Sequence, residues 1–161
     1  MGLIIKDKLP MLKVGYPTVS DKYNITGGVL AGSTAAKFGD LVKYSSTSGY
    51  YEAITGTVAL ADIAGFVLAT NVKLASTWPD GGVQVEPGEA FNLVLPGSYL
   101  AIELDSAATE ATIKANAQVY VIAASGKCTS VVGSNLKLEG VVFTGIYEKH
   151  GSKIVAEILV K

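Results

Sequence analysis

The sequence contains no arginine: all thirteen of its basic residues are lysine, and the formal net charge is −1. The planar guanidinium of Arg is the group that binds phosphate and guanine in bidentate fashion. Proteins that bind nucleic acid also carry a basic face. The composition therefore argues against a nucleic acid as partner.

Cysteine and histidine each occur once, as Cys128 and His150. A single Cys excludes an internal disulfide and suits a reducing compartment. No Cys/His cluster has metal-ligand spacing, and no nucleophile elbow, phosphate loop or dinucleotide fingerprint is present. We expect His150 to lie in a solvent-exposed turn and Cys128 to be a small buried hydrophobe in a strand. The carboxylates of Glu86 and Glu89 are better explained by a solvated turn than by acid–base chemistry. The sequence predicts a protein that is not an enzyme and has no cofactor or metal.

Long apolar runs are also missing, although 49% of the residues are hydrophobic. None approaches the roughly 20 residues of a membrane-spanning helix, so no membrane partner is expected. The N-terminus has only three apolar residues before charges intervene, which does not fit a signal peptide. High apolar content with eighteen glycines suits a sheet protein whose second face is covered as well, and a partner is one source of that cover.

Two segments, 41–70 and 118–144, share one pattern of short apolar runs closed by Gly, Ser or Asn. When Ser48-Gly49 is aligned with Ser125-Gly126, Val42 meets Val119, Gly56 meets Gly133, and Gly65-Phe-Val-Leu meets Gly140-Val-Val-Phe. Each segment predicts strand, tight turn, strand, loop, strand. The favoured interpretation is an internal duplication; the alternative is that any two glycine-punctuated hairpins look alike.

The remaining sequence predicts further strands. Residues 99–104 alternate, with Leu100, Ile102 and Leu104 on the buried side, and 83–95 indicate a hairpin around Pro87-Gly88. The C-terminal run 153–161 predicts a strand paired inside the sheet. Asp105-Ser106 offers N-cap chemistry for a helix of two turns at most over 107–114. We therefore predict an all-β protein, a compact β-barrel or β-sandwich over residues 28–161, with one short helix.

Residues 1–27 differ from the rest, because their apolar residues follow no period and two prolines interrupt them. We interpret them as an extended N-terminal arm that lies on a neighbouring subunit; the alternative is an edge strand of the same barrel. Deletion of residues 1–20 is then expected to leave the barrel folded while weakening attachment to the partner. The candidate interface residues, in the arm and at one exposed turn, are Leu3, Ile4, Ile5, Leu9, Met11, Leu12, Tyr16 and Trp78.

Aromatic residues leave a second functional class open. Tyr44, Tyr50 and Tyr51 lie in the first predicted hairpin, and Trp78 lies at a turn. Carbohydrate-binding modules use exposed aromatic rings as stacking platforms. No cluster of Asp, Asn and Arg accompanies these rings to bind hydroxyls, and aromatic residues also anchor protein contacts.

Several stretches resemble the small decoration, or cement, proteins of tailed-bacteriophage heads. They are Gly28-Val-Leu-Ala-Gly-Ser, Phe38-Gly-Asp-Leu-Val-Lys-Tyr, Ile63-Ala-Gly-Phe-Val-Leu, Val85-Glu-Pro-Gly-Glu-Ala, Ala115-Asn-Ala-Gln-Val-Tyr-Val and Leu138-Glu-Gly-Val-Val-Phe. The resemblance covers residues 28–161 and rests on pattern and turn placement.

The resemblance implies a β-barrel or β-sandwich without catalysis, made in the host cytoplasm. It would bind the outer surface of the assembled capsid and bridge subunits of the major capsid protein. It also implies homo-oligomers at local symmetry axes, with a trimer favoured and a dimer as the other option. The alternative to this function is a carbohydrate-binding β-sandwich, borne on the virion.

Overall fold

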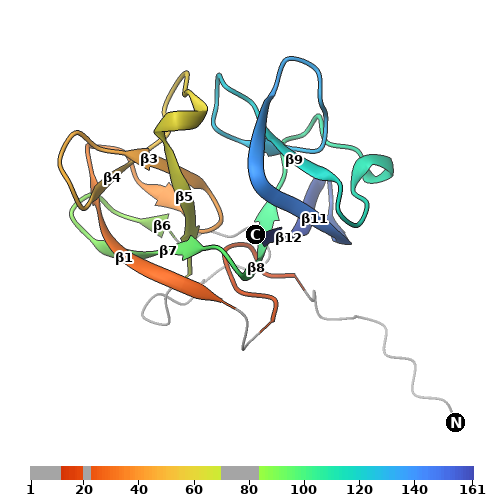
Figure 1. Cartoon of the computed structure of the whole chain (residues 1–161), viewed down its shortest axis with the longest axis horizontal. Coiled ribbons are helices and arrows are strands. Elements are labelled where there is room, and N and C mark those ends of the chain that lie inside the picture. Colours follow the sequence, from red (N-terminus) through yellow and green to blue (C-terminus); the bar gives the residue numbers. More distant parts are fainter. Residues whose placement is uncertain (1–11, 20–22, 70–83) are drawn as a thin grey trace, which may run out of the picture.

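A computed structural model describes residues 12–19, 23–69 and 84–161. Their regular secondary structure is almost entirely β-strand, arranged as two halves that lie side by side (Figure 1). This confirms the predicted all-β class. The strands of the first half are β1 (Asn24–Ala31), β3 (Leu41–Tyr44), β4 (Tyr50–Ala53), β5 (Ile63–Leu68) and β7 (Ala90–Leu95). Those of the second half are β8 (Ser98–Glu103), β9 (Gln118–Val121), β10 (Cys128–Thr129), β11 (Leu136–His150) and β12 (Lys153–Val160). The short strands β2 (Ala36–Lys37) and β6 (Gln84–Val85) form a separate pair.

The two halves have the same strand order. The first is a closed barrel in the order β1-β4-β3-β5-β7, in which β1 also pairs with β7. The second is a sheet in the order β10-β9-β11-β12-β8. If the strands of each half are numbered 1 to 5 in chain order, the closed barrel has the cyclic order 1-3-2-4-5 and the second sheet has the order 3-2-4-5-1. The second order is the same cycle, opened between strands 1 and 3. In the first half, β1 and β4 close the barrel by pairing in parallel. At the equivalent place in the second half, Asp105 N, just after β8, donates to the carbonyl of Cys128 in β10 at 2.8 Å.

Both predicted hairpins form within this arrangement. The Ser48-Gly49 turn joins β3 to β4, the Ser125-Gly126 turn joins β9 to β10, and both strand pairs are antiparallel. The third strand of each segment, β5 or β11, pairs with β3 or β9 on the other side. Duplication remains a prediction about the origin of the chain, and the matching strand order supports it.

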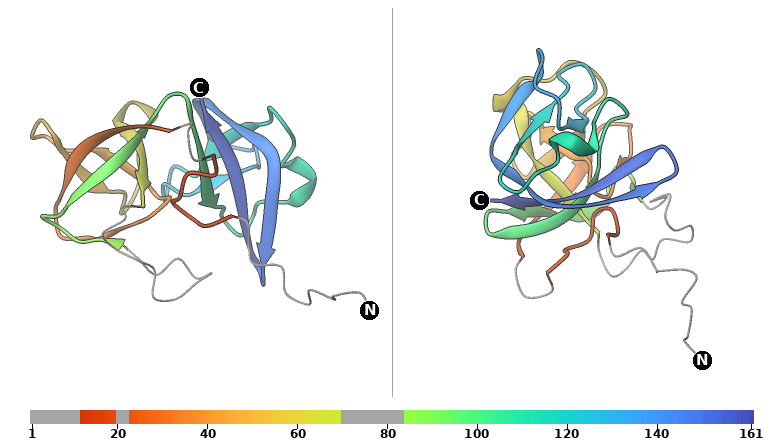
Figure 2. Two further views of the ribbon diagram at one scale, coloured as in Figure 1. Left: turned by 90° about the horizontal axis from the view of Figure 1, so that it is seen from below. Right: turned by 90° about the vertical axis from the view of Figure 1, so that its right-hand side faces the viewer.

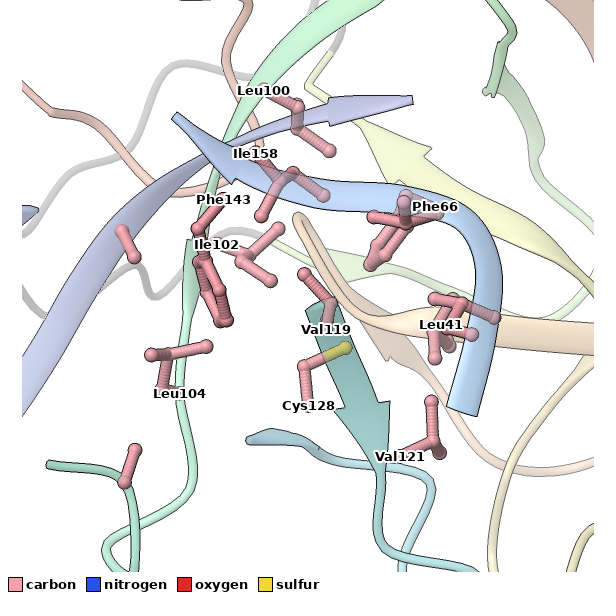
Figure 3. Close-up of a cluster of buried hydrophobic side chains, with 14 of the residues drawn as sticks. Leu41, Phe66, Leu100, Ile102, Leu104, Val119, Val121, Cys128, Phe143 and Ile158 are labelled. Atoms are coloured by element: carbon pink, nitrogen blue, oxygen red, sulfur yellow. The ribbon is translucent and has the colours of Figure 1, made fainter. Parts of the chain in front are cut away.

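Strands β3, β5 and β7 bury side chains on both faces. Their inward residues, which include Val42, Val67 and Leu93, fill the first barrel. Their outward residues Leu41 and Phe66 instead join the core of the second half, and Figure 3 shows them in the same cluster as Val119, Cys128 and Ile158. A strand covered on both faces is expected to be continuously apolar, which accounts for the run Phe66-Val67-Leu68. The cover for the second sheet face thus comes from the same chain.

Residues 12–18 cover the opposite face and the edge of the second sheet. The side chains of Leu12 and Val14 pack on Ala101 and Val155. Gly15 N donates to the Ala101 carbonyl (2.8 Å), and Ala69 N donates to the Gly15 carbonyl (2.6 Å). Gly15 has φ +77°, and a Cβ there would lie 2.3 Å from the Cβ of Phe38, so only glycine fits. This segment connects the first half to β8 through backbone hydrogen bonds.

Two strand predictions are confirmed. Residues Leu100, Ile102 and Leu104 are buried as the alternation indicated. The C-terminal strand β12 pairs with β11 on one side and β8 on the other. Strand β1 begins at Asn24, inside the stretch 1–27 that was expected to be an arm.

Two local predictions are wrong. The helix expected over 107–114 is a single 3-10 turn, η2 (Glu110–Thr112), and a similar turn, η1 (Leu60–Asp62), was not anticipated. The Thr112 hydroxyl binds the Thr109 carbonyl at 2.7 Å, a local hydrogen bond that competes with helix propagation. The hairpin expected over 83–95 does not pair with itself, because β6 pairs with β2 while β7 pairs with β1 and β5.

Candidate interaction surfaces

The predicted interface residues fall into two groups. Leu12 and Tyr16 lie in the described part of the chain, and both are occupied within it. Leu12 is 3% exposed and packs on the second sheet, whereas Tyr16 packs on the core of the first barrel with the Lys13 ammonium 4.1 Å from its ring centroid. The others lie outside the described residues: Leu3, Ile4, Ile5, Leu9, Met11 and Trp78.

The point where residues 1–11 join the described fold is held by the β11–β12 hairpin. Leu12 N donates to Glu148 Oε2 at 3.2 Å, and His150 Nε2 lies 3.4 Å from the same oxygen. His150 is the last residue of β11 and its side chain is 14% exposed, so the expectation of a solvent-exposed turn histidine is wrong. The imidazole of His150 and the backbone N–H of Leu12 therefore share the carboxylate of Glu148.

A polar cluster on the same hairpin fastens η2 to β11. Lys149 Nζ lies 2.6 Å from Glu110 Oε1, and the Tyr147 hydroxyl donates to Glu110 Oε2 at 3.2 Å. The hydrogen bond from Lys149 lowers the pKa of Glu110, and its counterpart raises the pKa of Lys149. The bond to Glu110 raises the pKa of Tyr147. All three groups are held in the states they have at neutral pH, which suits a fixed contact and not proton transfer.

A cleft of about 190 Å³ lies between the halves, lined by residues that include Lys37, Asp40, Glu103, Lys127 and Cys128. Burial raises the pKa of the Asp40 carboxyl, against the hydrogen bond from Lys37 N and the charge of Lys37. Cys128 is buried as predicted, and burial, with the Asp40 charge, raises the pKa of its thiol. The thiolate is the nucleophilic form, so this cysteine is held in its unreactive state.

The described residues contain neither a metal-binding cluster nor a membrane-spanning helix. No group of three or more His, Cys, Asp or Glu side chains there is placed to hold a metal ion. None of the helices in the described ranges has the length and hydropathy to cross a bilayer.

The tyrosines considered for sugar stacking have different environments. Tyr51 is half-buried, with its ring 5.7 Å from Phe91 in an edge-to-face arrangement. Tyr44 and Tyr50 are 57% and 42% exposed on β3 and β4. Beside them, Lys43 Nζ lies 3.3 Å from Glu52 Oε2, so the nearest charged groups are paired with one another.

One exposed apolar group was missed by sequence reasoning. Tyr23 and Ile25 are 43% and 42% exposed, at and just before the start of β1. They fell within the stretch interpreted as an arm. The signal that would have found them is the uncharged run Asn24-Ile25-Thr26, whose β-branched residues directly precede residue 28, where the predicted β-domain begins.

Comparison with known proteins places this fold. Residues 8–159 match the family model described as structural cement protein (E217 gp24/Pam3 gp6). No curated protein matches the chain. A solved structure titled "The capsid of Myoviridae Phage XM1" contains a chain with the same fold, at a TM-score of 0.69 and 17% sequence identity, covering 100% of this chain and 97% of that one. Because the family model spans nearly all of the sequence, the chain belongs to the phage structural cement protein family.

Proposed function

We propose that this protein binds the outer surface of an assembled phage capsid and stabilises it by bridging neighbouring subunits of the major capsid protein. The observation that carries the proposal is the match of residues 8–159 to a family of structural cement proteins. The described geometry fits a structural role, because burial raises the pKa of the Cys128 thiol and the Glu110, Tyr147 and Lys149 side chains contact one another.

The bridging mechanism is mechanical. A molecule that binds only the assembled state stabilises that state by mass action, by about 2.7 kcal/mol at a free concentration 100 times the dissociation constant. Two contacts held on one rigid body act with a high effective concentration, so each contact is allowed to be weak. The shared core of the two halves, which Leu41 and Phe66 enter from the first half, supplies that rigidity.

The remaining parts of the proposal follow from this role. The protein would have no catalytic activity, no cofactor, and no nucleic-acid or membrane partner. It would be made in the bacterial cytoplasm and act on the virion surface as a homo-oligomer. The two halves would derive from duplication of a five-stranded unit, which their common strand order supports.

The N-terminal segment is proposed as a second point of attachment. Leu12 is held at Glu148, so the N-terminal segment joins the described fold at the β11–β12 hairpin. Four of the large aliphatic residues in 1–11 are Leu3, Ile4, Ile5 and Leu9. Burying one such side chain contributes about 1.5–3 kcal/mol, and ordering one residue costs roughly 1–2 kcal/mol, so the balance is close and depends on a surface to pack against. A capsid surface would supply the opposing wall.

Co-sedimentation with empty heads of the cognate phage tests both points. We expect the full chain to sediment with assembled heads and not with unassembled capsid protein, and to raise the temperature at which heads open. Deletion of residues 1–11 should weaken binding without lowering the melting temperature of the free protein. Deletion of residues 1–20 also removes the buried Leu12 and Val14, so, contrary to the expectation from the sequence, it should lower the melting temperature, and it serves as the comparison for folding. Absence of binding by the full chain would contradict the proposed function.

A carbohydrate-binding role is retained as the second candidate, because Tyr44 and Tyr50 are exposed on adjacent strands. Binding of the full chain to a polysaccharide array, lost in a Tyr44→Ala variant that still sediments with heads, would establish it. An array without any bound polysaccharide would remove it.

A further inference from the structure

Among the described residues, no strand pairs with one edge of β1 over its first five residues. Strand β1 pairs with β7 from Asn24 to Val29, but with β4 only from Val29 to Ala31. Figure 2 (left) shows β1 and β7 running together along the first half. Within the described part of the chain, no strand pairs with residues 24–28 on the side away from β7.

The backbone groups that face this open edge follow from the alternation of an antiparallel ladder. Leu30 N donates to the Glu89 carbonyl (3.0 Å) on the β7 side. Val29 N, one residue earlier, points the other way and lies 3.4 Å from the Gly49 carbonyl on the β4 side. Counting back by two, the N–H and C=O groups of Ile25 and Gly27 also point away from β7. They form a short template for another strand.

This edge lacks the features that usually protect one. Exposed edges are commonly blocked by Lys, by Pro or by a bulge. Residues 23–28 contain neither charge nor proline, and β1 pairs with β7 in continuous register. Tyr23 and Ile25 are large, apolar and exposed, and a Cβ added at Gly27 would meet nothing within 4 Å. An uncharged edge of this kind favours pairing.

We propose that the edge pairs with the same edge of a second copy, antiparallel about a two-fold axis at Ile25. Ile25 then faces Ile25 of the second copy, and the ring of Tyr23 lies over Gly27 of the second copy. The first barrel already contains such an arrangement: the Tyr51 ring lies over Gly28, where a Cβ would be 2.3 Å from its Cε2 atom. Ile25 and Gly27 share one face of β1. Tyr23 precedes the strand by one residue, and continuing the alternation to it puts all these contacts on one side of the joined sheet.

A second copy fits this edge better than the other available occupants. Residues 1–11 carry the charged run Lys6-Asp7-Lys8 in their middle, whereas 23–28 placed opposite itself brings no charges together. The described residues of each copy present this β1 edge once, so two-fold pairing uses it completely and closes the assembly as a dimer. In the second half, the corresponding edge of β8 is already covered by residues 15–18, including a bridge between Pro17 and Leu100.

This inference rests on the homo-oligomer part of the proposed function and selects the dimer. It makes no use of capsid binding, so the free protein is sufficient to test it. Failure of capsid co-sedimentation would leave it standing, and failure of dimerisation would leave capsid binding standing.

The first experiment is sedimentation equilibrium of the full chain over a concentration series, with hydrogen exchange measured at both ends of the series. We expect a monomer–dimer equilibrium. The Ile25 and Gly27 amides should be protected only at high concentration, while Val29 is protected throughout. A trimer, a monomer at all concentrations, or protection confined to residues 1–11 would overturn the proposal.

The second experiment uses charge pairs at the axis. Ile25→Lys and Ile25→Asp each place like charges opposite one another, and should weaken self-association roughly tenfold or more. An equimolar mixture of the two variants should restore the dimer as a heterodimer, because the opposite charges then face each other. The unchanged melting temperature of each variant serves as the folding control. Self-association of Ile25→Lys at the wild-type level, or failure of the mixture to restore the dimer, would overturn the pairing.

Discussion

Replacement of Phe66 by Ala tests whether the two halves unfold as one unit. Phe66 lies on β5 of the first half, is 2% exposed, and packs in the core that the second half contributes most residues to (Figure 3). Truncation of a buried Phe to Ala costs about 3–5 kcal/mol, from lost transfer free energy and the cavity left behind. Because the cavity opens at the junction, we expect the loss to be felt on both sides of it.

Phe91→Ala is the matched control. Phe91 is also 2% exposed, but it packs inside the first barrel against Tyr51. The two variants remove the same atoms from sites of equal burial, and they differ in whether the second half lines the cavity. For a chain of this size, 1 kcal/mol shifts the melting temperature by about 2–4 °C. Either variant should therefore melt about 6–20 °C below the wild type.

Calorimetry combined with native-state hydrogen exchange provides the measurement. In the Phe66→Ala protein we expect one cooperative transition, with the slowest amides of β5 and of β12 losing the same free energy of opening. The Phe91→Ala protein should behave alike if the chain is fully cooperative. Should the β12 amides of Phe66→Ala keep their wild-type protection while those of β5 lose it, the halves unfold separately and the reasoning is refuted.

Three further outcomes follow from single sites. Gly28→Ala should lower the free energy of unfolding by about 1–3 kcal/mol, because the added Cβ meets the Tyr51 ring. Gly27→Ala places its Cβ in open space and should change the free energy of unfolding by less than about 0.5 kcal/mol. Urea denaturation of the two variants makes the comparison. Burial raises the pKa of the Asp40 carboxyl above its ordinary value, so the native state binds more protons than the unfolded state. The free energy of unfolding therefore falls as pH rises from the ordinary pKa to the raised one. Asp40→Asn should remove this pH dependence and be more stable at neutral pH, as urea titrations across acid pH would show. Alkylation of Cys128 in the native protein should be roughly a thousandfold or more slower than in urea, and a fast native reaction, followed by mass spectrometry, would contradict its burial.

The sequence pattern predicted strands well where large apolar residues alternate with polar or small ones. In 99–104 this period identified the face of Leu100, Ile102 and Leu104, which enter the core of the second half. Ala101 on the other face is buried as well, under Leu12 and Val14, and the alternation did not indicate that. The turns Ser48-Gly49 and Ser125-Gly126 were predictable for a local reason, since glycine there adopts positive φ, +80° at Gly49 and +70° at Gly126.

Pairing between distant segments was not predictable in this way. Periodicity reports that a residue is buried but not which strand covers it. Thus 83–95 looked like a hairpin, although β6 finds its partner in β2, nearly fifty residues upstream. Leu12 was predicted as a residue that contacts a neighbouring subunit, whereas in the structure Ala101 and Val155 of the same chain cover it. His150 looked like a turn residue because Gly151 follows it, whereas β11 extends to His150 itself.

The junction between the halves bears on the proposed bridging of capsid subunits. Only Pro96 and Gly97 separate β7 from β8, and this linker is fixed on both sides. The side-chain amide Nδ2 of Asn24 donates to the Pro96 carbonyl (2.7 Å), and Gly97 N donates to the Val160 carbonyl (2.7 Å). A flexible linker would let two contacts search a large volume and would lower their effective concentration. With the halves held by a common core and a short fixed linker, two surfaces of the molecule keep a constant separation. A lattice that presents its subunits at that separation gains the full benefit of both contacts, and a lattice at another spacing gains only one. Stiffness between the halves, and not affinity at either one, is then the property by which a cement protein of this build would select the assembled capsid.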